Sequence, residues 1–451
     1  MTRLRWILVV CVLGLVLSGM VACQQQPDEA PAPTATKTLR PTYTPLQPTA
    51  TPVPPTATKV RPTATMTATA EPTATPEPTE EPTATPDPPT ATPIPPTPTP
   101  EPEAQEATAA QEPATKASSG QVAAQPKGSP LTYAPEFPGP APVSGPPSHD
   151  DHTNPLSGVH VDDPNTIKRR PVMVRYGNDS AARPHSGISQ AEVVFEDVMD
   201  AWWITRITAV YLQHQPEQAG PLRSARPVNV ELLPAFDGVL VFSGASIGVT
   251  QLLAQQPFDL IHEGSNGDLF YRGSDRPSPH NLYTSVAATR ERMGALGWER
   301  AVDLRGFAFS ADAPAGPSVS RIDIPYPKTS TVAWTWDRGV GVYRRWVKGA
   351  PYTEHLTGEQ VGCANVVVLY AKHWESDIVE DSRGSTSIGI ALRGSERVQV
   401  FRDGRVIDGF WYRSENNKLF QFVDGNGNHI PLKPGNTWIQ LVPTSYNLGL
   451  S

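Results

Sequence analysis

The stretch that decides the fold is Trp203 to Pro227, WITRITAVYLQHQPEQAGPLRSARP. Residues 204–211 divide into two alternating sets of side chains, and this period of two predicts a β-strand. A turn at Gln215-Pro216-Glu217 follows, and the stretch ends in a Gly- and Pro-bounded segment with Arg223 and Arg226. Planar guanidinium groups suit the binding of phosphate or carboxylate. The two arginines are therefore interpreted either as an anion receptor or as solvated surface charge.

Strands and helices alternate on both sides of this stretch. Apolar runs bounded by turn residues predict strands, and longer runs with capping signals predict helices, Ser285 being the expected N-cap of the last one. The expected strands are 170–176, 191–197, 204–211 and 238–242, and the expected helices are 228–236, 247–255 and 285–297. Alternation of this kind predicts an α/β or α+β subdomain, placed at 151–310.

The remainder of the chain, residues 318–451, has a different pattern. Short apolar runs are separated by turn signals such as Asp403-Gly404 and Gly425-Asn426-Gly427. Nine strand candidates fall in this segment, at 319–324, 331–336, 340–347, 365–371, 387–392, 398–401, 405–412, 419–423 and 437–442. The sequence therefore predicts a second, mainly β subdomain.

The first 23 residues have the features of an export signal. Arg3 and Arg5 precede an apolar run over 6–17 that is too short to span a bilayer. Met20-Val21-Ala22-Cys23 resembles the bacterial lipobox, with Met20 where Leu is usual, and this resemblance implies that Cys23 is diacylated. Two acyl chains give stable anchoring, so the protein is expected on the extracytoplasmic face of the bacterial cell membrane. The alternative is an ordinary signal peptide with an incidental cysteine.

Residues 24–150 are dominated by Thr, Pro, Ala and Glu. Most of the 51 prolines of the 451-residue chain lie in its first third, and this composition offers too few apolar side chains to offset the ordering entropy. A long disordered linker between the anchor and the folded body is therefore predicted.

Several classes of function are disfavoured by composition and motif. The formal net charge of −8 argues against a nucleic-acid partner. No P-loop, dinucleotide fingerprint or nucleophile elbow occurs in the sequence, so no cofactor is expected. His149, His152 and His160 lack a tight zinc pattern, and no metal site is predicted. Cys363 has no evident base beside it and is expected to be a small buried residue.

Polar loops follow several of the expected strands, and such loops are where open α/β sheets bind ligands. A cleft that binds an anion is therefore one hypothesis, and its candidate ligand-binding residues are Arg183, Arg206, Arg223, Arg226, Arg272, Arg276, His280, Asn281 and Tyr283. The alternative is that some of the arginines form internal ion pairs with Glu196, Asp197 and Asp275. His280 and Asn281 would serve as general base and oxyanion donor, or simply hold a loop. The acidic segment 375–381 is expected to be a solvated loop.

Segments spread over the folded part together resemble the YerB-like family of bacterial envelope lipoproteins. They are 171–174 (PVMV), 183–187 (RPHSG), 191–196 (AEVVFE), 205–206 (TR), 220–227 (GPLRSARP), 279–283 (PHNLY), 343–346 (YRRW), 351–352 (PY) and 435–439 (GNTWI). The resemblance implies two subdomains, a lipid anchor and a role at the cell envelope. It implies no catalytic residues, because the family has no established activity.

The sequence thus predicts a lipid-anchored envelope protein that binds an anionic ligand derived from the wall or from a lipid, or a protein of cell-wall synthesis. The alternative is an enzyme. The order of a strand, a turn and a strand ending in an arginine motif is similar to that of LytR-CpsA-Psr enzymes. This similarity would imply a phosphotransferase or hydrolase acting on polyprenyl-phosphate-linked glycans. The acidic residues typical of those enzymes are not convincingly placed here, so a binding role is favoured over catalysis.

Overall fold

The structure is a computed structural model in which residues 128–451 are described. The expected signal peptide, the lipidation of Cys23 and residues 24–127 of the expected linker lie outside the described residues.

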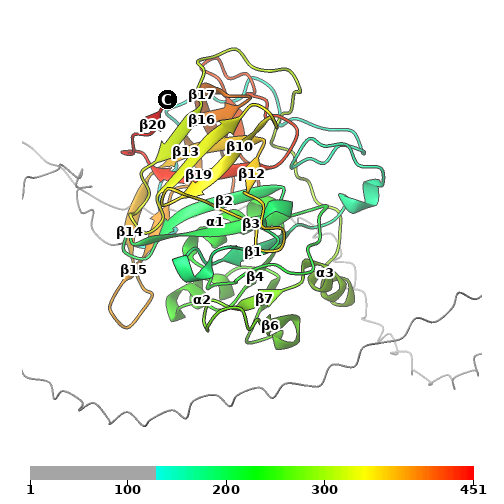
Figure 1. The fold of residues 1–451 in the computed structure, drawn as a ribbon, viewed down its shortest axis with the longest axis vertical. Coiled ribbons are helices and arrows are strands. Elements are labelled where there is room, and N and C mark those ends of the chain that lie inside the picture. The colour runs from blue at the N-terminus through cyan, green and yellow to red at the C-terminus, as the bar shows by residue number, and fades with distance from the viewer. Residues whose placement is uncertain (1–127) are drawn as a thin grey trace, which may run out of the picture. The chain divides into compact units, whose positions relative to one another are not determined.

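The body is built on one ten-stranded sheet, whose central strands follow one another down the molecule in Figure 1. In sheet order the strands are β18 (Gln421–Val423), β17 (Arg405–Arg413), β16 (Gly394–Arg402), β13 (Asn365–Ala371), β19 (Thr437–Pro443), β2 (Val193–Met199), β3 (Ile204–Tyr211), β1 (Val172–Tyr176), β4 (Val239–Phe242) and β5 (Leu260–His262). The expected strand at 204–211 is confirmed as β3, between β1 and β2.

The remaining strands form a smaller sheet and two hairpins. The smaller sheet runs β11 (Ala350–Pro351), β10 (Val342–Val347), β9 (Val332–Asp337), β8 (Arg321–Ile324) and β20 (Gly449–Leu450), and β12 (Gly362–Cys363) also pairs with β10. The hairpins are β14 (His373–Val379) with β15 (Thr386–Ile390), and β6 (Phe270–Arg272) with β7 (Leu282–Thr284).

Three α-helices accompany the sheets in the described part of the chain. They are α1 (Pro227–Phe236), α2 (Ile247–Ala254) and α3 (Val286–Ala295), and short 3-10 turns occur at Pro164–Thr166, Ser180–Ala182, Ile188–Gln190 and Gly267–Leu269. Ser246 and Ser285 cap α2 and α3 through their hydroxyl groups, as N-cap serines do. No described helix is long and apolar enough to cross a bilayer.

The predicted fold class is confirmed, because helices and strands alternate up to residue 295 and strands prevail after residue 320. The two segments nevertheless share one sheet. The parallel pairing of β2 with β19, in which Val194 lies opposite Trp438, joins a strand of the first segment to a strand of the second. The subdomain boundary near residue 310 stays a prediction, and this sheet runs across it.

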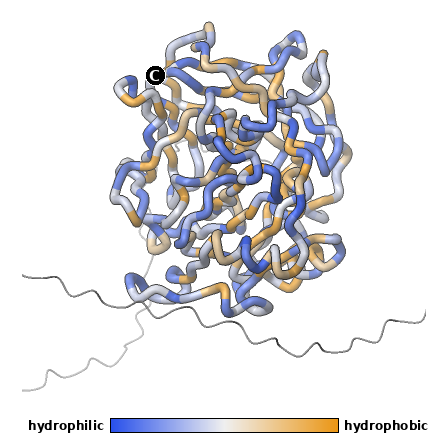
Figure 2. The backbone as a smooth tube through the Cα atoms, turned by 90° about the vertical axis from the view of Figure 1, so that its right-hand side faces the viewer, coloured by the Kyte–Doolittle hydropathy of each residue, from blue (hydrophilic) through white to orange (hydrophobic). Residues whose placement is uncertain are grey.

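Apolar side chains cover both faces of the large sheet, since its strands are buried on both sides. One core contains Phe195, Leu232 and Phe236 beside α1, and the other contains Val194, Trp334 and Trp438 beneath the smaller sheet. Figure 2 shows that hydrophobic and hydrophilic segments alternate along the backbone of the body. Cys363 is fully buried in the second core, as expected, and burial raises the pKa of its thiol.

Residues 128–147, which we call the strap, correct the predicted end of the linker. The backbone of the strap bonds to the body at several points, including Ser395 N to Glu136 O at 2.7 Å and Val143 N to Gly427 O at 3.0 Å. Gly394 has a φ of 122°, and a Cβ there would lie 2.4 Å from Glu136 O, so a glycine is needed for the strap to approach. The linker therefore ends before the strap rather than at residue 150, because backbone bonds, the packing of Leu131 against the core and the ring contact of Tyr133 with Trp374 hold the strap on the body.

The expected solvated loop at 375–381 is also corrected. Residues 373–379 form β14, which pairs with β15 across a bulge between Glu375 and Val379. The polar run misled the interpretation because Asp377 and Val379 are exposed, whereas Trp374 and Ser376 of the same strand are buried.

Candidate functional site

The stretch 221–226 lies at one edge of the large sheet, where the carboxyl ends of β1 and β4 meet. The two strands are parallel, and the stretch runs between their ends, with Arg223 N bonded to Arg175 O at 2.9 Å and Ser243 N bonded to Arg223 O at 3.1 Å. This edge is where open α/β sheets place ligand sites. Strand β3 is antiparallel to β1, so its beginning, with Arg206, reaches the same edge. We call Arg206, Arg223 and Arg226, with Asp179, Asp200, His280 and Glu380, the arginine site.

Arg206 is the residue of the arginine site whose charge is least compensated. Its side chain belongs to a residue that is only 9% exposed, and it donates one hydrogen bond, from Nη1 to Ser224 O at 2.8 Å. Within residues 128–451 it forms no ion pair. Burial holds the pKa of the Arg206 guanidinium well below its ordinary value, the positive charge of Arg226 lowers it further, and the carboxylate of Asp200 opposes them only in part. Buried arginines are normally paired with a carboxylate, so Arg206 is an exception that needs an explanation.

Arg226, in contrast, is neutralised from within. Its Nε and Nη2 donate to Asp200 Oδ1 and Oδ2 at 2.7 and 2.6 Å, the bidentate geometry of a strong pair. Glu380 approaches the same guanidinium at 3.3 Å, and burial raises the pKa of Glu380. Asp200 is held in this position by the β2–β3 turn, where its φ is 36° and those of Ala201 and Trp202 are 49° and 65°. Left-handed backbone at three successive non-glycine residues is strained, and such strain is commonly found at functional sites.

Arg223 occupies the open end of the arginine site. Its Nη2 lies 3.4 Å from Asp179 Oδ2 and 3.1 Å from His280 Nδ1, and its side chain remains 18% exposed. A Cβ on Gly177 would lie 2.5 Å from Arg223 Cγ, so the glycine makes room for this side chain. Arg223 can therefore reach a ligand from solvent while staying close to Arg206.

A fourth arginine, Arg175, lies beneath the site with its own carboxylate. Its Nη1 and Nη2 donate to Asp197 Oδ1 and Oδ2 at 2.5 and 2.8 Å, and Nη1 also donates to Thr208 Oγ1 at 2.9 Å. Both members of the pair are almost fully buried. This pair belongs to the framework that positions the site rather than to the surface that meets a ligand.

The other predicted ligand-binding residues divide into separate groups. Arg272 pairs with Glu263 at 2.8 Å and donates to Asn281 Oδ1 at 3.1 Å, while Asn281 Nδ2 donates to Gly273 O. These contacts favour the interpretation of Asn281 as a residue that holds a loop.

A second group surrounds Asp275. Arg276 donates to Asp275 Oδ2 at 2.7 Å, and the Tyr283 hydroxyl donates to the same oxygen at 3.1 Å. Burial raises the pKa of Tyr283 to about 12. Arg183 lies nearby with a 3.5 Å contact to Asn178 Oδ1 and no ion pair in the described part of the chain.

The alternative of internal ion pairs is thus correct for Arg276 and, with partners the sequence did not suggest, for Arg226 and Arg272. Asp275 pairs as expected. Asp197 pairs with Arg175, and Glu196 pairs with the buried Arg345 at 2.8 Å on the other face of the sheet. A single cleft lined by all six arginines stays a prediction, although Arg226, Arg272 and Arg276 are engaged in ion pairs. The structure brings together Arg206, Arg223, Arg226 and His280.

Sequence reasoning missed three carboxylates of this site, Asp179, Asp200 and Glu380. Asp179 follows β1 in a turn, and Asp200 lies in the β2–β3 turn, so both were visible as polar residues after strands. Glu380 comes from the β14–β15 hairpin, far away in the chain, and no local signal could have placed it beside Arg226.

The environment of His280 predicts the direction of its titration. Burial lowers the pKa of His280, Arg223 lowers it further, and Asp179 opposes them. As the pH falls below about 6.5, the pKa of histidine in the unfolded chain, the unfolded chain binds more protons at this position than the folded chain does. The contribution of His280 to the free energy of unfolding therefore falls as the pH falls through this range. We expect the NMR titration of His280 to have a midpoint below 6.5, and the midpoint to drop further in Asp179→Asn. A midpoint at or above 6.5 would contradict this geometry.

Comparison with known proteins gives a family but no activity. Residues 156–299 match the N-terminal domain of a protein of unknown function (DUF3048), and residues 322–439 match its C-terminal domain. The chain belongs to the DUF3048 family. It is also 32% identical over 294 residues to the Bacillus subtilis (strain 168) protein named "Putative lipoprotein YerB", covering 64% of this chain and 86% of that protein.

A solved structure supports the DUF3048 assignment. The crystal structure of the YerB protein from Bacillus subtilis aligns with a TM-score of 0.57 at 28% identity, covering 66% of this chain and 99% of that one. The resemblance to a YerB-like family is therefore confirmed. The first match, over residues 156–299, includes every residue of the arginine site except Glu380. Glu380 falls in the second match, over residues 322–439.

Proposed function

We propose that this DUF3048 protein is a lipid-anchored envelope protein whose body binds an anionic group at the arginine site. Arg206 and Arg223 would hold the anion, and Arg226 with its two carboxylates would position them. The name of the Bacillus subtilis relative, a lipoprotein, agrees with the lipobox-like segment ending in Cys23. The protein is thus expected to act outside the cytoplasm, tethered to the membrane by Cys23.

The observation that carries this proposal is the uncompensated Arg206. A buried guanidinium without a carboxylate has a substantial desolvation cost, and repulsion from Arg226 adds to it. A bound anion would remove both costs. This is the arrangement expected of a group retained for a ligand rather than for stability.

The distribution of charge favours binding of the anion at the end of the site that contains Arg206 and Arg223. Around Arg226 the charges are balanced or negative, because Asp200 and Glu380 both contact it. At the other end, Arg206 forms no ion pair within the described residues, and Arg223 contacts Asp179 at a long 3.4 Å. The positive surplus therefore lies where Arg223 is open to solvent, and an anion would be drawn there.

Apolar side chains in the flanking segments favour an anion attached to an apolar chain. Trp203 is 68% exposed three residues after Asp200, Val379 is 55% exposed directly before Glu380, and Ile247 is 81% exposed at the start of α2. Each belongs to a segment that supplies or adjoins a residue of the arginine site. A contiguous exposed apolar patch commonly marks contact with a membrane or a partner, and the proposal takes these three side chains as parts of one such surface. We therefore propose a lipid-derived phosphate or pyrophosphate as the ligand class.

A calorimetric titration with two probes tests the proposal. Inorganic pyrophosphate and farnesyl pyrophosphate carry the same anion, with and without an apolar chain. We expect the full chain to bind both, and farnesyl pyrophosphate at least about tenfold more tightly, because burial of even a few CH₂ groups contributes about 0.8 kcal/mol each. Arg206→Gln should weaken the binding of both probes by about thirtyfold or more, since truncating one partner of a buried charged pair costs roughly 2–5 kcal/mol.

The matched control is Arg272→Gln, which removes an arginine of the predicted set that is exposed and paired with Glu263. This variant should bind both probes as the wild type does. Equal weakening in the two variants would indicate nonspecific attraction to positive charge, and tight binding by Arg206→Gln would contradict the proposed site.

A further inference from the structure

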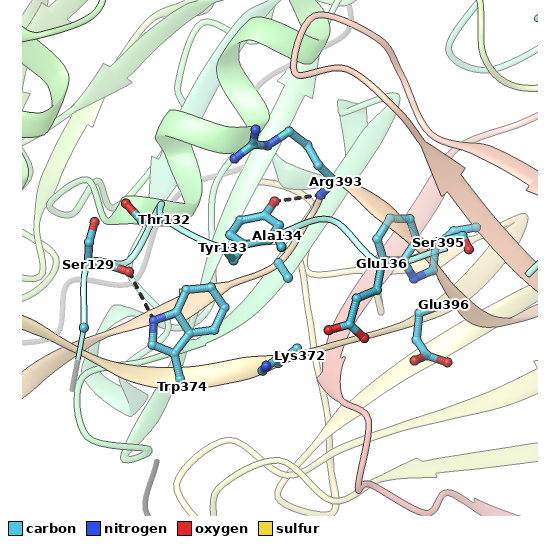
Figure 3. A pocket seen from close by; sticks show the side chains of 13 residues that line it. Ser129, Thr132, Tyr133, Ala134, Glu136, Lys372, Trp374, Arg393, Ser395 and Glu396 are labelled. Carbon is cyan, nitrogen blue, oxygen red and sulfur yellow. Dashed lines mark hydrogen bonds between the residues drawn. The ribbon is translucent and has the colours of Figure 1, made fainter. Parts of the chain in front are cut away.

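A cavity lies between the strap and the strands beneath it, and none of the three arginines of the arginine site lines it. Its volume is about 330 Å³, at the lower end of the range for small-molecule sites, which is roughly 300–1,000 Å³. The strap supplies one wall through residues 128–136, and the body supplies the other through β14, β16 and the turns before them. Figure 3 shows this arrangement with Tyr133 and Trp374 in the lining.

Hydrogen bonds and a ring contact fix the wall that the strap contributes to the cavity. The Tyr133 hydroxyl accepts hydrogen bonds from Leu392 N and Arg393 N at 2.9 and 2.8 Å, and the Tyr133 ring packs against Trp374 with centroids 5.7 Å apart. Trp374 Nε1 donates to Ser129 O at 3.3 Å. Defined contacts therefore hold the strap wall of the cavity to the wall formed by the body.

Most polar groups of the lining are already engaged. Besides the contacts of Tyr133 and Trp374, Trp411 Nε1 donates to Tyr370 O at 2.7 Å. Arg393 lies over the Tyr133 ring and contacts Glu231 at 3.3 Å. These groups shape the cavity, but they already form contacts within the protein. Other side chains must therefore recognise a ligand.

Three charged side chains of the lining remain without an ion pair in the described residues, namely Lys372, Glu136 and Glu396. The bond from Ser395 N to Glu136 O places the two glutamates on adjoining segments. Figure 3 shows their carboxylates near one end of the lining, with Lys372 between them and Trp374. Lys372 is not within ion-pair distance of either glutamate, so opposite charges face the same space without neutralising each other.

We infer that this cavity binds a small zwitterion, of the class of a short peptide with a free ammonium and a free carboxylate. The ammonium would lie between Glu136 and Glu396, and the carboxylate would lie on Lys372. A volume of about 330 Å³ admits a molecule of a few amino-acid residues. This site is independent of the arginine site, and because Glu136 comes from the strap it exists only when the strap is in place.

A set of dipeptide probes tests the inference on the full chain. We expect alanyl-alanine to bind in an NMR or calorimetric titration, and its N-acetyl and C-terminal amide derivatives to bind at least about tenfold more weakly, the worth of one hydrogen bond to a charged group. In Lys372→Ala the dipeptide and its amide should bind equally. In the double variant Glu136→Gln with Glu396→Gln the dipeptide and its N-acetyl form should bind equally.

The control is Glu359→Gln, an exposed glutamate outside the cavity, which should reproduce the wild-type ranking of the three probes. Failure of alanyl-alanine to bind the folded wild-type chain at millimolar concentration would overturn the inference. Binding that ignores the charges of the probe, or that survives unchanged in both cavity variants, would overturn it as well.

Discussion

Replacing Arg206 by methionine is expected to abolish anion binding and, in the absence of ligand, to raise the free energy of unfolding by about 1 kcal/mol. Methionine has a similar length and carries no charge, so it removes the desolvation cost and the repulsion from Arg226. Exchanges of buried ionic groups for apolar ones of similar volume are often neutral or stabilising by about 1–4 kcal/mol. We take the low end because Ser224 O loses its partner.

Urea denaturation followed by circular dichroism measures this effect, with the calorimetric titration of pyrophosphate on the same samples. A gain in stability together with a loss of binding distinguishes a residue retained for a ligand from one retained for stability. A loss of more than about 1 kcal/mol of stability in Arg206→Met would assign Arg206 a structural role, even if binding were also lost.

Replacing Asp197 by asparagine is expected to lower the free energy of unfolding by about 3–5 kcal/mol, the usual cost of breaking a buried ion pair from one side. The change leaves the guanidinium of Arg175 buried without its two short bonds to the carboxylate. Because a domain of ordinary stability has about 5–15 kcal/mol in total, Asp197→Asn should be close to the limit of folding. Denaturation by urea, with the wild type as reference, gives the difference.

The matched control for this prediction is Asp303→Asn. Asp303 pairs with Arg305 at 2.7 Å, but both side chains are more than half exposed, and exposed pairs contribute about 0–1 kcal/mol. If Asp303→Asn and Asp197→Asn had the same effect, burial would not be what makes the Arg175–Asp197 pair important.

Local sequence signals were sufficient for most of the elements. The period of two at 204–211, the expected serine cap at Ser285 and the glycine turns after residue 318 correspond to β3, α3 and the later strands. Each of these depends on neighbours within a few residues. The parallel pairing of β2 with β19 could not be predicted in this way, because the paired strands are separated by most of the folded chain.

The candidate site shows the same division. Arg223 and Arg226 were identified because they lie in a turn after an apolar strand, and Arg206 belongs to that strand. The structure places all three at one edge of the sheet. Their partners were missed where they come from distant segments. Glu380 in particular was assigned to a solvated loop, since nothing near it in sequence indicates that β14 and β15 carry it to Arg226.

We propose that the arginine site holds a lipid-derived anion. The most direct test of this proposal is native mass spectrometry of the full chain extracted in mild detergent from its own cells, beside the Arg206→Met and Arg272→Gln variants. We predict an additional mass corresponding to an apolar phosphate or pyrophosphate on the wild type and on Arg272→Gln, and none on Arg206→Met. A wild-type chain without any such adduct, or an adduct that persists in Arg206→Met, would contradict the claim.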